Sequence, residues 1–159
     1  DTTVEYSIDG ELTKELLAKG IFFKYANNYF FNSPDADYSG IKDEKLFSEF
    51  TKYLTEEDFK YVSQTEIEID NLIKGASDKE EIKDELLKIK DDLKGLFEKE
   101  MQIYKSEILR EIRSELAARY LGLEGRIEDQ LNSDLQVQVA LDILSEMDTY
   151  NKLLNVAVR

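Results

Sequence analysis

Residues 77–122 decide the fold, and the sequence there is SDKEEIKDELLKIKDDLKGLFEKEMQIYKSEILREIRSELAARYLG. Its first four residues match the capping box S-x-x-E, in which the Ser and Glu side chains each satisfy a backbone N–H that would otherwise lack a partner. Apolar residues then recur at alternating spacings of four and three, which is a heptad pattern. The pattern predicts one long helix of roughly 40 residues, far above the mean helix length of about 11–12.

The heptad pattern falls into two seams that meet near Gly95. The first seam is Ile82, Leu86, Ile89, Leu93 and Leu96, and the second is Phe97, Met101, Tyr104, Ile108, Ile112, Leu116 and Tyr120. A change of register of this kind accompanies a bend or a coiled-coil stutter. Because the first seam is thin and flanked by charges, we expect that half to project. It would then pair with residues 65–74 or with a second copy of the chain.

Two further segments are predicted at the start of the chain. Apolar spacing predicts a helix over 11–31. Gly20 interrupts it, and glycine in a helix costs about 1 kcal/mol relative to alanine, so we expect two short pieces with the aromatic half the more buried. Residues 32–40 hold the only proline and several turn formers, which favours a loop.

Two short helices are predicted next. Apolar residues share one side of a helix over 43–54. Thr55 is followed by three acidic residues, and this pattern predicts an N-cap at Thr55. A helix over 65–74 follows, and Gly75 is placed to end it because glycine tolerates the left-handed conformation found just after many helices.

The chain is expected to fold back after the long helix. Gly122 and Gly125 indicate a tight turn that leads into residues 126–131. Ser133 is predicted to cap a last helix over 134–154. We therefore predict an all-α fold, an elongated helical bundle with one long bent helix and a folded-back C-terminal helix.

The arginines near this turn alternate with glutamates at helical spacing. Such pairs stabilise a helix by a few tenths of a kcal/mol each, so we predict structural ion pairs. Arg126 could tie the turn to the last helix. The residues concerned are Arg110, Arg113, Arg119 and Arg126 with Glu107, Glu111, Glu115 and Glu124.

Composition excludes several classes of function. The chain has 159 residues with 35 acidic and 21 basic side chains, a formal net charge of −14. Nucleic-acid and anionic-lipid binding need clustered Lys and Arg, so neither is expected. The chain has no His and no Cys, which removes the Ser-His-Asp triad, thiolate nucleophiles and the commonest metal ligands. No apolar run reaches the roughly 20 residues of a membrane span.

The loop over 32–40 and its flank match part of the EF-hand pattern. Four residues match its first, third, fifth and sixth positions and one matches its ninth; these are Asp35, Asp37, Ser39, Gly40 and Asp43. The twelfth position requires a bidentate Glu but is Leu46, which cannot chelate. We therefore predict a polar turn, with a weak calcium site as the alternative.

Other polar groupings point to a solvated surface rather than to catalysis. Acidic and basic residues alternate at helical spacing over 79–100, and di-metal carboxylate bundles use Glu-x-x-His motifs that a His-free chain lacks. Ser48 with Lys52, and Lys105 with Ser106, lie on charge-rich helices without a glycine-rich turn to form an oxyanion hole. We predict no catalytic residue, no cofactor and no metal on this chain.

Aromatic residues crowd one short stretch in a chain with nine Tyr and eight Phe. They cannot all face one side of a helix, so some are expected in the core. The others are a candidate docking surface, because aromatic residues are enriched at interfaces. The candidate interface residues are Phe22, Phe23, Tyr25, Tyr29, Phe30 and Phe31.

The chain resembles a known family at several of these segments. Asp1-Thr2-Thr3 with the following Tyr-Ser pair, and LLAKGIFFKYANNY over 16–29, look like the segment after the protease core in Bacteroidetes-type carboxyl-terminal processing (tail-specific) serine peptidases. Residues 108–120, the run Gly-Arg-Ile-Glu from Gly125, and residues 137–144 are similar to the C-terminal helical tail of the same family.

The resemblance implies a non-catalytic tail domain of a cell-envelope or periplasmic protease. Residues 1–10 would then be a strand or linker from the upstream protease core, and residues 11–159 a single helical domain. Partners would be the upstream protease and PDZ domains of the same polypeptide, with a homo-oligomer possible, and the tail would support assembly, core positioning or substrate gating. Because the chain begins at Asp1 without Met, we expect a mature product or an excised piece. The alternative is a free-standing helical adaptor that binds another protein through residues 22–31.

Overall fold

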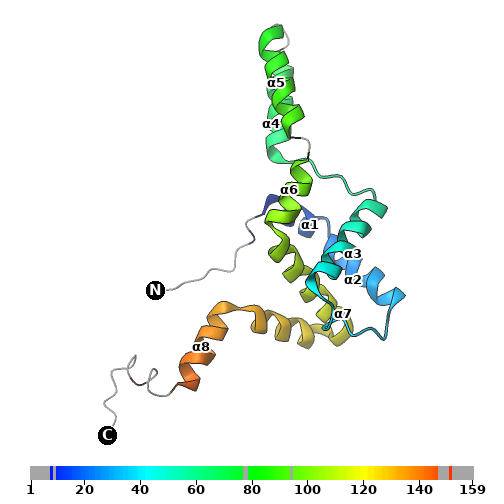
Figure 1. The fold of residues 1–159 in the computed structure, drawn as a ribbon, viewed down its shortest axis with the longest axis vertical. Coiled ribbons are helices and arrows are strands. Elements are labelled where there is room, and N and C mark those ends of the chain that lie inside the picture. The colour runs from blue at the N-terminus through cyan, green and yellow to red at the C-terminus, as the bar shows by residue number, and fades with distance from the viewer. Residues whose placement is uncertain (1–7, 9, 77–78, 94, 147–150, 152–159) are drawn as a thin grey trace.

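The fold is all-α and elongated, as the sequence predicts (Figure 1). The computed structural model describes residues 8, 10–76, 79–93, 95–146 and 151. Within them the helices are α1 (Glu11–Ala18), α2 (Ile21–Asn32), α3 (Asp43–Glu56), α4 (Gln64–Gly75), α5 (Glu80–Asp92), α6 (Leu96–Ile103), α7 (Lys105–Ser133) and α8 (Leu135–Ser145). The predicted linker over 1–10 lies outside these residues except for Ile8 and Gly10.

The core forms where α1, α2, α3 and α6 pack against the first half of α7. Phe22 of α2 stacks on Phe50 of α3 with ring centroids 5.5 Å apart, and Tyr25 meets the edge of Phe50 at 5.1 Å. The second heptad seam supplies the other side of this core. Its buried members are Met101, Ile108, Ile112 and Leu116, and Phe97, Tyr104 and Tyr120 pack against them.

Gly20 separates α1 from α2, as predicted. Its φ of 64° lies in the left-handed region, which glycine adopts without a steric penalty. Leu12 and Leu16 of α1 are fully buried, so the half of the predicted helix before Gly20 is buried as well as the aromatic half. Both pieces belong to the core.

The predicted cap at Thr55 is wrong, because α3 continues through this residue to Glu56. The Thr55 hydroxyl donates a hydrogen bond to the carbonyl of Thr51, one turn earlier in the same helix. Asp58 then takes a positive φ of 49° and turns the chain away. Acidic residues here end a helix rather than begin one.

Ser63 caps α4 in a complete capping box. Its hydroxyl accepts a hydrogen bond from the Glu66 N–H at 3.2 Å, and the Glu66 carboxylate accepts one from the Ser63 N–H at 3.0 Å. The predicted stop at Gly75 is wrong by one residue: Gly75 is the last residue of α4, and Ala76 is the C-cap. The backbone needs no left-handed residue there.

Replacing Ser63 with Ala is expected to lower the free energy of unfolding by about 1 kcal/mol, because the buried hydroxyl satisfies a backbone N–H of α4. Exposed Thr65 in the same first turn is the control, and Thr65→Ala should change it by less than about 0.5 kcal/mol. Urea unfolding of both variants measures the difference. Equal effects would mean that the cap does not stabilise α4.

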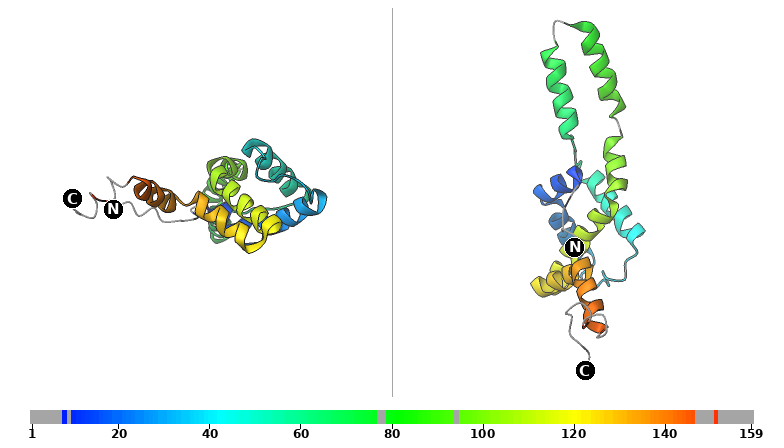
Figure 2. Two further views of the ribbon diagram at one scale, coloured as in Figure 1. Left: turned by 90° about the horizontal axis from the view of Figure 1, so that it is seen from below. Right: turned by 90° about the vertical axis from the view of Figure 1, so that its left-hand side faces the viewer.

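The helix that carries most of the first heptad seam, α5, lies beside α4 of the same chain, one of the two expected outcomes. α4 and α5 form a hairpin that projects from the body (Figures 1 and 2). Lys90 of α5 contacts Asp70 of α4 at 2.5 Å. In the described part of α5 no side chain is buried, which agrees with a thin seam flanked by charges.

The single long helix is wrong in one respect, because it is three helices. Gly95 has a φ of 85° and separates α5 from α6, where the bend was predicted. A second break falls at Tyr104, whose φ of −97° and ψ of 17° are not helical. α5 begins at Glu80 with Lys79 as N-cap, and Ser77 of the predicted capping box lies outside the described residues.

The chain folds back at Gly122, as predicted. Gly122 has φ 75° and ψ −160° inside α7 and divides this helix into a first half and a folded-back half. Arg126 contacts Glu115 at 2.8 Å, so it ties the two halves of α7 together. The predicted tie between the turn and the last helix is therefore wrong. Gly125 is buried against Ala117 and Leu121.

α8 follows the folded-back half at the end of the body opposite the hairpin (Figure 1). Asp134 is its N-cap and accepts hydrogen bonds from the Gln136 and Val137 N–H groups at 2.7 and 3.2 Å. The predicted cap at Ser133 is therefore displaced by one residue, since the carboxylate of Asp134 reaches both N–H groups. α8 ends at Ser145, and most of the predicted helix beyond it lies outside the described residues. No helix described is long and apolar enough to cross a membrane.

Candidate functional site

The predicted aromatic interface divides between the core and the surface. Phe22 and Tyr25 are 1% and 3% exposed, so they stabilise the core and are not available to a partner in this structure. Tyr29 and Phe30 are half-buried, and Phe30 meets the ring of Tyr120 at 5.0 Å. Phe23 and Phe31 are 54% and 78% exposed. These last two carry the interface prediction.

A small cavity lies beside Phe23, between α2 and α7. Its volume is about 160 Å³, and Asn27, Arg119 and Arg126 also line it. The Asn27 Oδ1 and Arg126 Nε atoms are buried without a hydrogen-bond partner within the described residues. Buried polar atoms of this kind are commonly satisfied by ordered water. The cavity therefore suits water between α2 and the two halves of α7.

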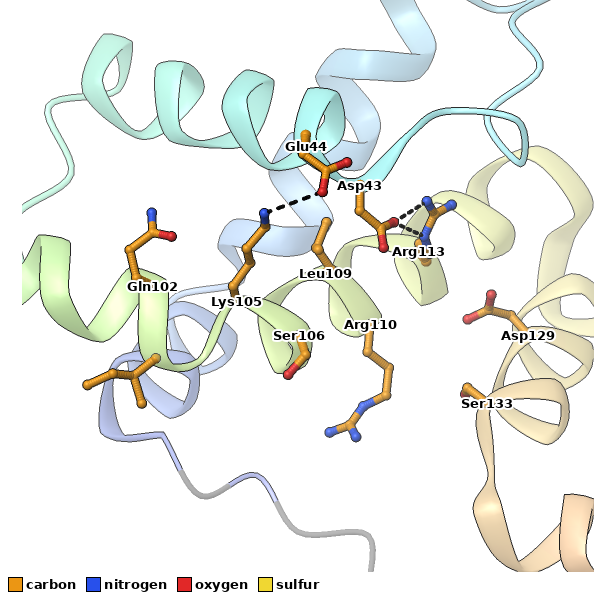
Figure 3. A pocket seen from close by; sticks show the side chains of 11 residues that line it. Asp43, Glu44, Gln102, Lys105, Ser106, Leu109, Arg110, Arg113, Asp129 and Ser133 are labelled. Carbon is orange, nitrogen blue, oxygen red and sulfur yellow. Dashed lines mark hydrogen bonds and ion pairs between the residues drawn. The ribbon is translucent and has the colours of Figure 1, made fainter.

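A larger cavity lies between the two halves of α7, with the first turn of α3 on a third side (Figure 3). Its volume is about 550 Å³. Ionic contacts fill one edge: Arg113 donates to the Asp43 carboxylate at 2.5 Å and to the Ile41 carbonyl at 2.7 Å. Lys105 lies 4.0 Å from Glu44 on the same side. The charges at this edge hold the start of α3 onto α7.

Asp129 faces these cations from the folded-back half of α7 (Figure 3). Burial raises the pKa of Asp129, and the nearby Glu111 raises it further, whereas the Arg113 guanidinium lowers it. The carboxyl group is therefore a weaker acid than usual. Ser106 and Ser133 also line this cavity, and the Ser133 hydroxyl donates a hydrogen bond to the Gln130 carbonyl at 3.1 Å.

Both Ser–Lys neighbours have other contacts for their lysines. Lys52 lies 3.4 Å from Glu56 at the exposed surface of α3. The Lys105 ammonium lies 5.3 Å from the centre of the Phe47 ring, in addition to its contact with Glu44. Each lysine is thus placed to neutralise or to cover a neighbour rather than to take a proton from Ser48 or Ser106.

Asp37 stabilises the loop over 33–42 from within. The Asp37 carboxylate accepts hydrogen bonds from the Ser39 hydroxyl at 2.6 Å and from the Gly40 N–H at 3.2 Å, which lowers the pKa of Asp37. Asp43 is held by Arg113. In the described residues no three acidic side chains come together as a metal site. The geometry is that of an Asx-type polar turn.

Tyrosines are the other residues whose pKa the structure shifts. Burial is the main cause of a raised pKa at six tyrosines. Tyr61 is the most connected: its hydroxyl donates to Glu100 at 2.8 Å and lies 3.4 Å from Glu11. These hydrogen bonds and the two negative charges further raise its pKa. The six are Tyr25, Tyr29, Tyr38, Tyr53, Tyr61 and Tyr120.

We expect stability to fall at alkaline pH. Because the pKa of these tyrosines is raised in the folded state, the unfolded chain loses these protons first, from about pH 10. The stabilisation is therefore complete below about pH 10 and is lost as the pH rises from there through the pKa values of the folded state. Urea midpoints between about pH 9 and about pH 11 measure this loss, and Tyr61→Phe should reduce its steepness. A midpoint that does not change over this range would contradict the tyrosine environments described.

A comparison with known families supports the protease resemblance. Residues 12–144 match the family described as "Probable PDZ-protease, C-terminal helical domain". The chain belongs to this family. No curated protein and no solved structure matches the chain. Membership in the family confirms the predicted helical C-terminal domain and assigns the chain to the helical part of a probable protease, apart from its catalytic part.

Two features of the structure are not among those predicted from the sequence. The capping box Ser63-Gln-Thr-Glu66 is visible in the sequence as S-x-x-E and could have been found by the criterion applied to residues 77–80. The Arg113–Asp43 ion pair joins residues 70 positions apart, and no local pattern reports such a contact.

Proposed function

We propose that the chain is the non-catalytic C-terminal helical domain of a carboxyl-terminal processing serine protease, and that it positions the protease core of the same polypeptide. Family membership carries the proposal. The folded-back half of α7 and α8 support it, because they expose Leu123, Leu131, Leu141 and Leu144 at 71%, 49%, 54% and 57%. Exposed apolar surface of this extent is typical of an interaction site.

Two further properties belong to the proposal. The parent protein would act in the periplasm or the cell envelope. The domain would also support self-association or gate the access of substrate, since both need a rigid body attached to the protease. These roles differ in their readout, because the first changes the mass of the assembly and the second changes the rate for large but not for small substrates.

Deleting residues 11–146 from the parent protein tests the proposal. Misplacing catalytic groups by about 1 Å can cost roughly 100-fold in rate, so we expect cleavage of a protein substrate to fall by about tenfold or more. Labelling of the catalytic serine by a small phosphonate should persist, which shows that the protease core still folds. Unchanged cleavage and unchanged assembly mass would contradict the proposal.

A free-standing adaptor remains the second candidate, and exposed Phe23 and Phe31 favour it. An adaptor would bind a separate protein through these rings with no protease in the polypeptide. The coding sequence upstream of Asp1 separates the two: a Ser–Lys protease core there supports the first proposal, and its absence supports the adaptor.

A further inference from the structure

The chain enters the helical domain at a fixed point beside the junction of α6 and α7. Gly10 precedes α1, is buried, and donates from its N–H to the Glu107 carboxylate at 3.3 Å. A Cβ at Gly10 would lie 2.7 Å from the Tyr104 ring and 2.9 Å from Glu107. Only glycine fits this approach, so the packing holds the start of α1 against the first turn of α7.

The large cavity opens next to this point. Gln102, Ile103 and Ser106 line it, and each lies within two positions of Tyr104 or Glu107, which contact Gly10. Ile103 is 69% exposed, a large apolar side chain at the rim. Figure 3 shows Arg110 extending into the opening, with Ser133 on the opposite wall. The domain therefore presents a concave face lined mostly by polar side chains, with exposed Ile103 at its rim and Arg110, which also lies 3.9 Å from Glu111. Arginine is among the residues enriched at interface hot spots.

The folded-back half of α7 forms the opposite wall, and it leads to a helix that the body does not cover. In the described part of α8 no side chain is buried, although its sequence is largely apolar. Figure 1 shows α8 on the same side of the body as the start of α1. One side of the molecule thus holds the point where the chain enters, the concave face and an uncovered apolar helix.

We propose that this concave face binds the preceding, protease-containing part of the same polypeptide. That part would place an apolar side chain over Ile103 and a carboxylate opposite Arg110. The inference rests on the proposed function and names the surface that performs it. Chain continuity favours this occupant: a domain joined through Gly10 meets the face at a high effective concentration, so even a weak interface is occupied. A second copy lacks this proximity, and its binding here is one of the outcomes that the test separates.

Thiol labelling tests docking at the concave face directly, since the chain contains no Cys of its own. Ile103→Cys and Ser133→Cys place a thiol on opposite walls of the cavity. Leu72→Cys on the projecting hairpin is the matched control, because Leu72 is 58% exposed. Each variant is made in the intact parent polypeptide and alkylated with iodoacetamide. Mass spectrometry measures the alkylation rate of the peptide that carries the new Cys, so that cysteines elsewhere do not contribute. Each rate is divided by the rate of the same variant in urea.

We expect Ile103→Cys and Ser133→Cys to react about tenfold or more slowly than Leu72→Cys, because access limits the rate. The protection should persist on dilution to monomer. Equal rates at the three positions would overturn the inference, as would protection that disappears on dilution, which would indicate a second copy. Protection that appears only when a separate protein is added would also overturn it, in favour of an adaptor.

This readout does not depend on proteolysis. If the deletion variant loses activity while the labelling rates are equal, the domain acts through another surface and the proposed function stands. If the labelling rates differ but deletion changes neither activity nor assembly, the preceding part of the polypeptide covers the concave face and the proposed function fails.

Discussion

Replacing Phe22 with Ala is expected to lower the free energy of unfolding by about 3–5 kcal/mol. Phe22 is 1% exposed, and its ring stacks on Phe50 at 5.5 Å. Removing the ring deletes buried apolar surface and leaves a cavity between α2 and α3, which the surrounding helices can close only in part. Urea unfolding of the purified chain, followed by circular dichroism at 222 nm (the α-helix band), measures the change.

Phe31 provides the control from the same aromatic cluster. It is 78% exposed at the end of α2, so Phe31→Ala should alter the free energy of unfolding by less than about 0.5 kcal/mol. The comparison removes the same ring from the same helix and varies only its burial. Similar losses for the two variants would contradict the division of the cluster between core and surface.

Replacing Gly125 with Ala is expected to lower the free energy of unfolding by about 1–3 kcal/mol. A Cβ at this position would lie 2.4 Å from the Leu121 Cβ and 2.9 Å from the Ala117 carbonyl oxygen. Both neighbours belong to the first half of α7, so the new methyl group must push the folded-back half away from it. Loss of the Arg126–Glu115 contact should accompany the change.

Gly75→Ala is the matched control. Gly75 lies in α4, and nothing lies within 4 Å of a Cβ built there. Alanine is the better helix former by up to about 1 kcal/mol, so this variant should be neutral or more stable. The same substitution thus has opposite effects at the two glycines. Thermal unfolding checks the sign, and a Gly125→Ala variant as stable as the parent would show that the two halves of α7 do not pack as described.

Periodicity predicted the parts of the fold that local chemistry determines. The second heptad seam supplies Met101, Ile108, Ile112 and Leu116 to the core, and the breaks at Gly20, Gly95 and Gly122 fall where a glycine interrupts an apolar pattern. These positions share a physical cause: φ is positive at each, and glycine alone adopts it at little cost.

The boundaries that failed depend on contacts that a local pattern does not contain. The second break at Tyr104 falls where α6 and α7 meet the start of α1, since the Tyr104 ring lies against Gly10. Asp134 rather than Ser133 caps α8 because its carboxylate reaches two N–H groups. The division of the aromatic cluster follows from α3 and α7 covering one side of α2, which the sequence of α2 alone does not specify.

The candidate site was predictable only in outline. Aromatic crowding pointed to residues 22–31, yet the concave face lies elsewhere, between residues distant in sequence such as Ile103 and Ser133. Its polar edge depends on the Arg113–Asp43 pair, which spans 70 positions. Charge alternation predicted ion pairs for the arginines of this region: Arg126 contacts Glu115 of the predicted set, whereas Arg113 contacts Asp43, outside it.

The central claim is that this helical domain serves a protease without performing the cleavage. Hydrolysis of a fluorogenic peptide by the purified chain, next to the intact parent protein at equal concentration, tests it most directly. We predict that the parent cleaves the peptide and that the chain alone releases no product above the buffer control. Cleavage by the chain alone, abolished by Ser106→Ala or Ser133→Ala, would contradict it.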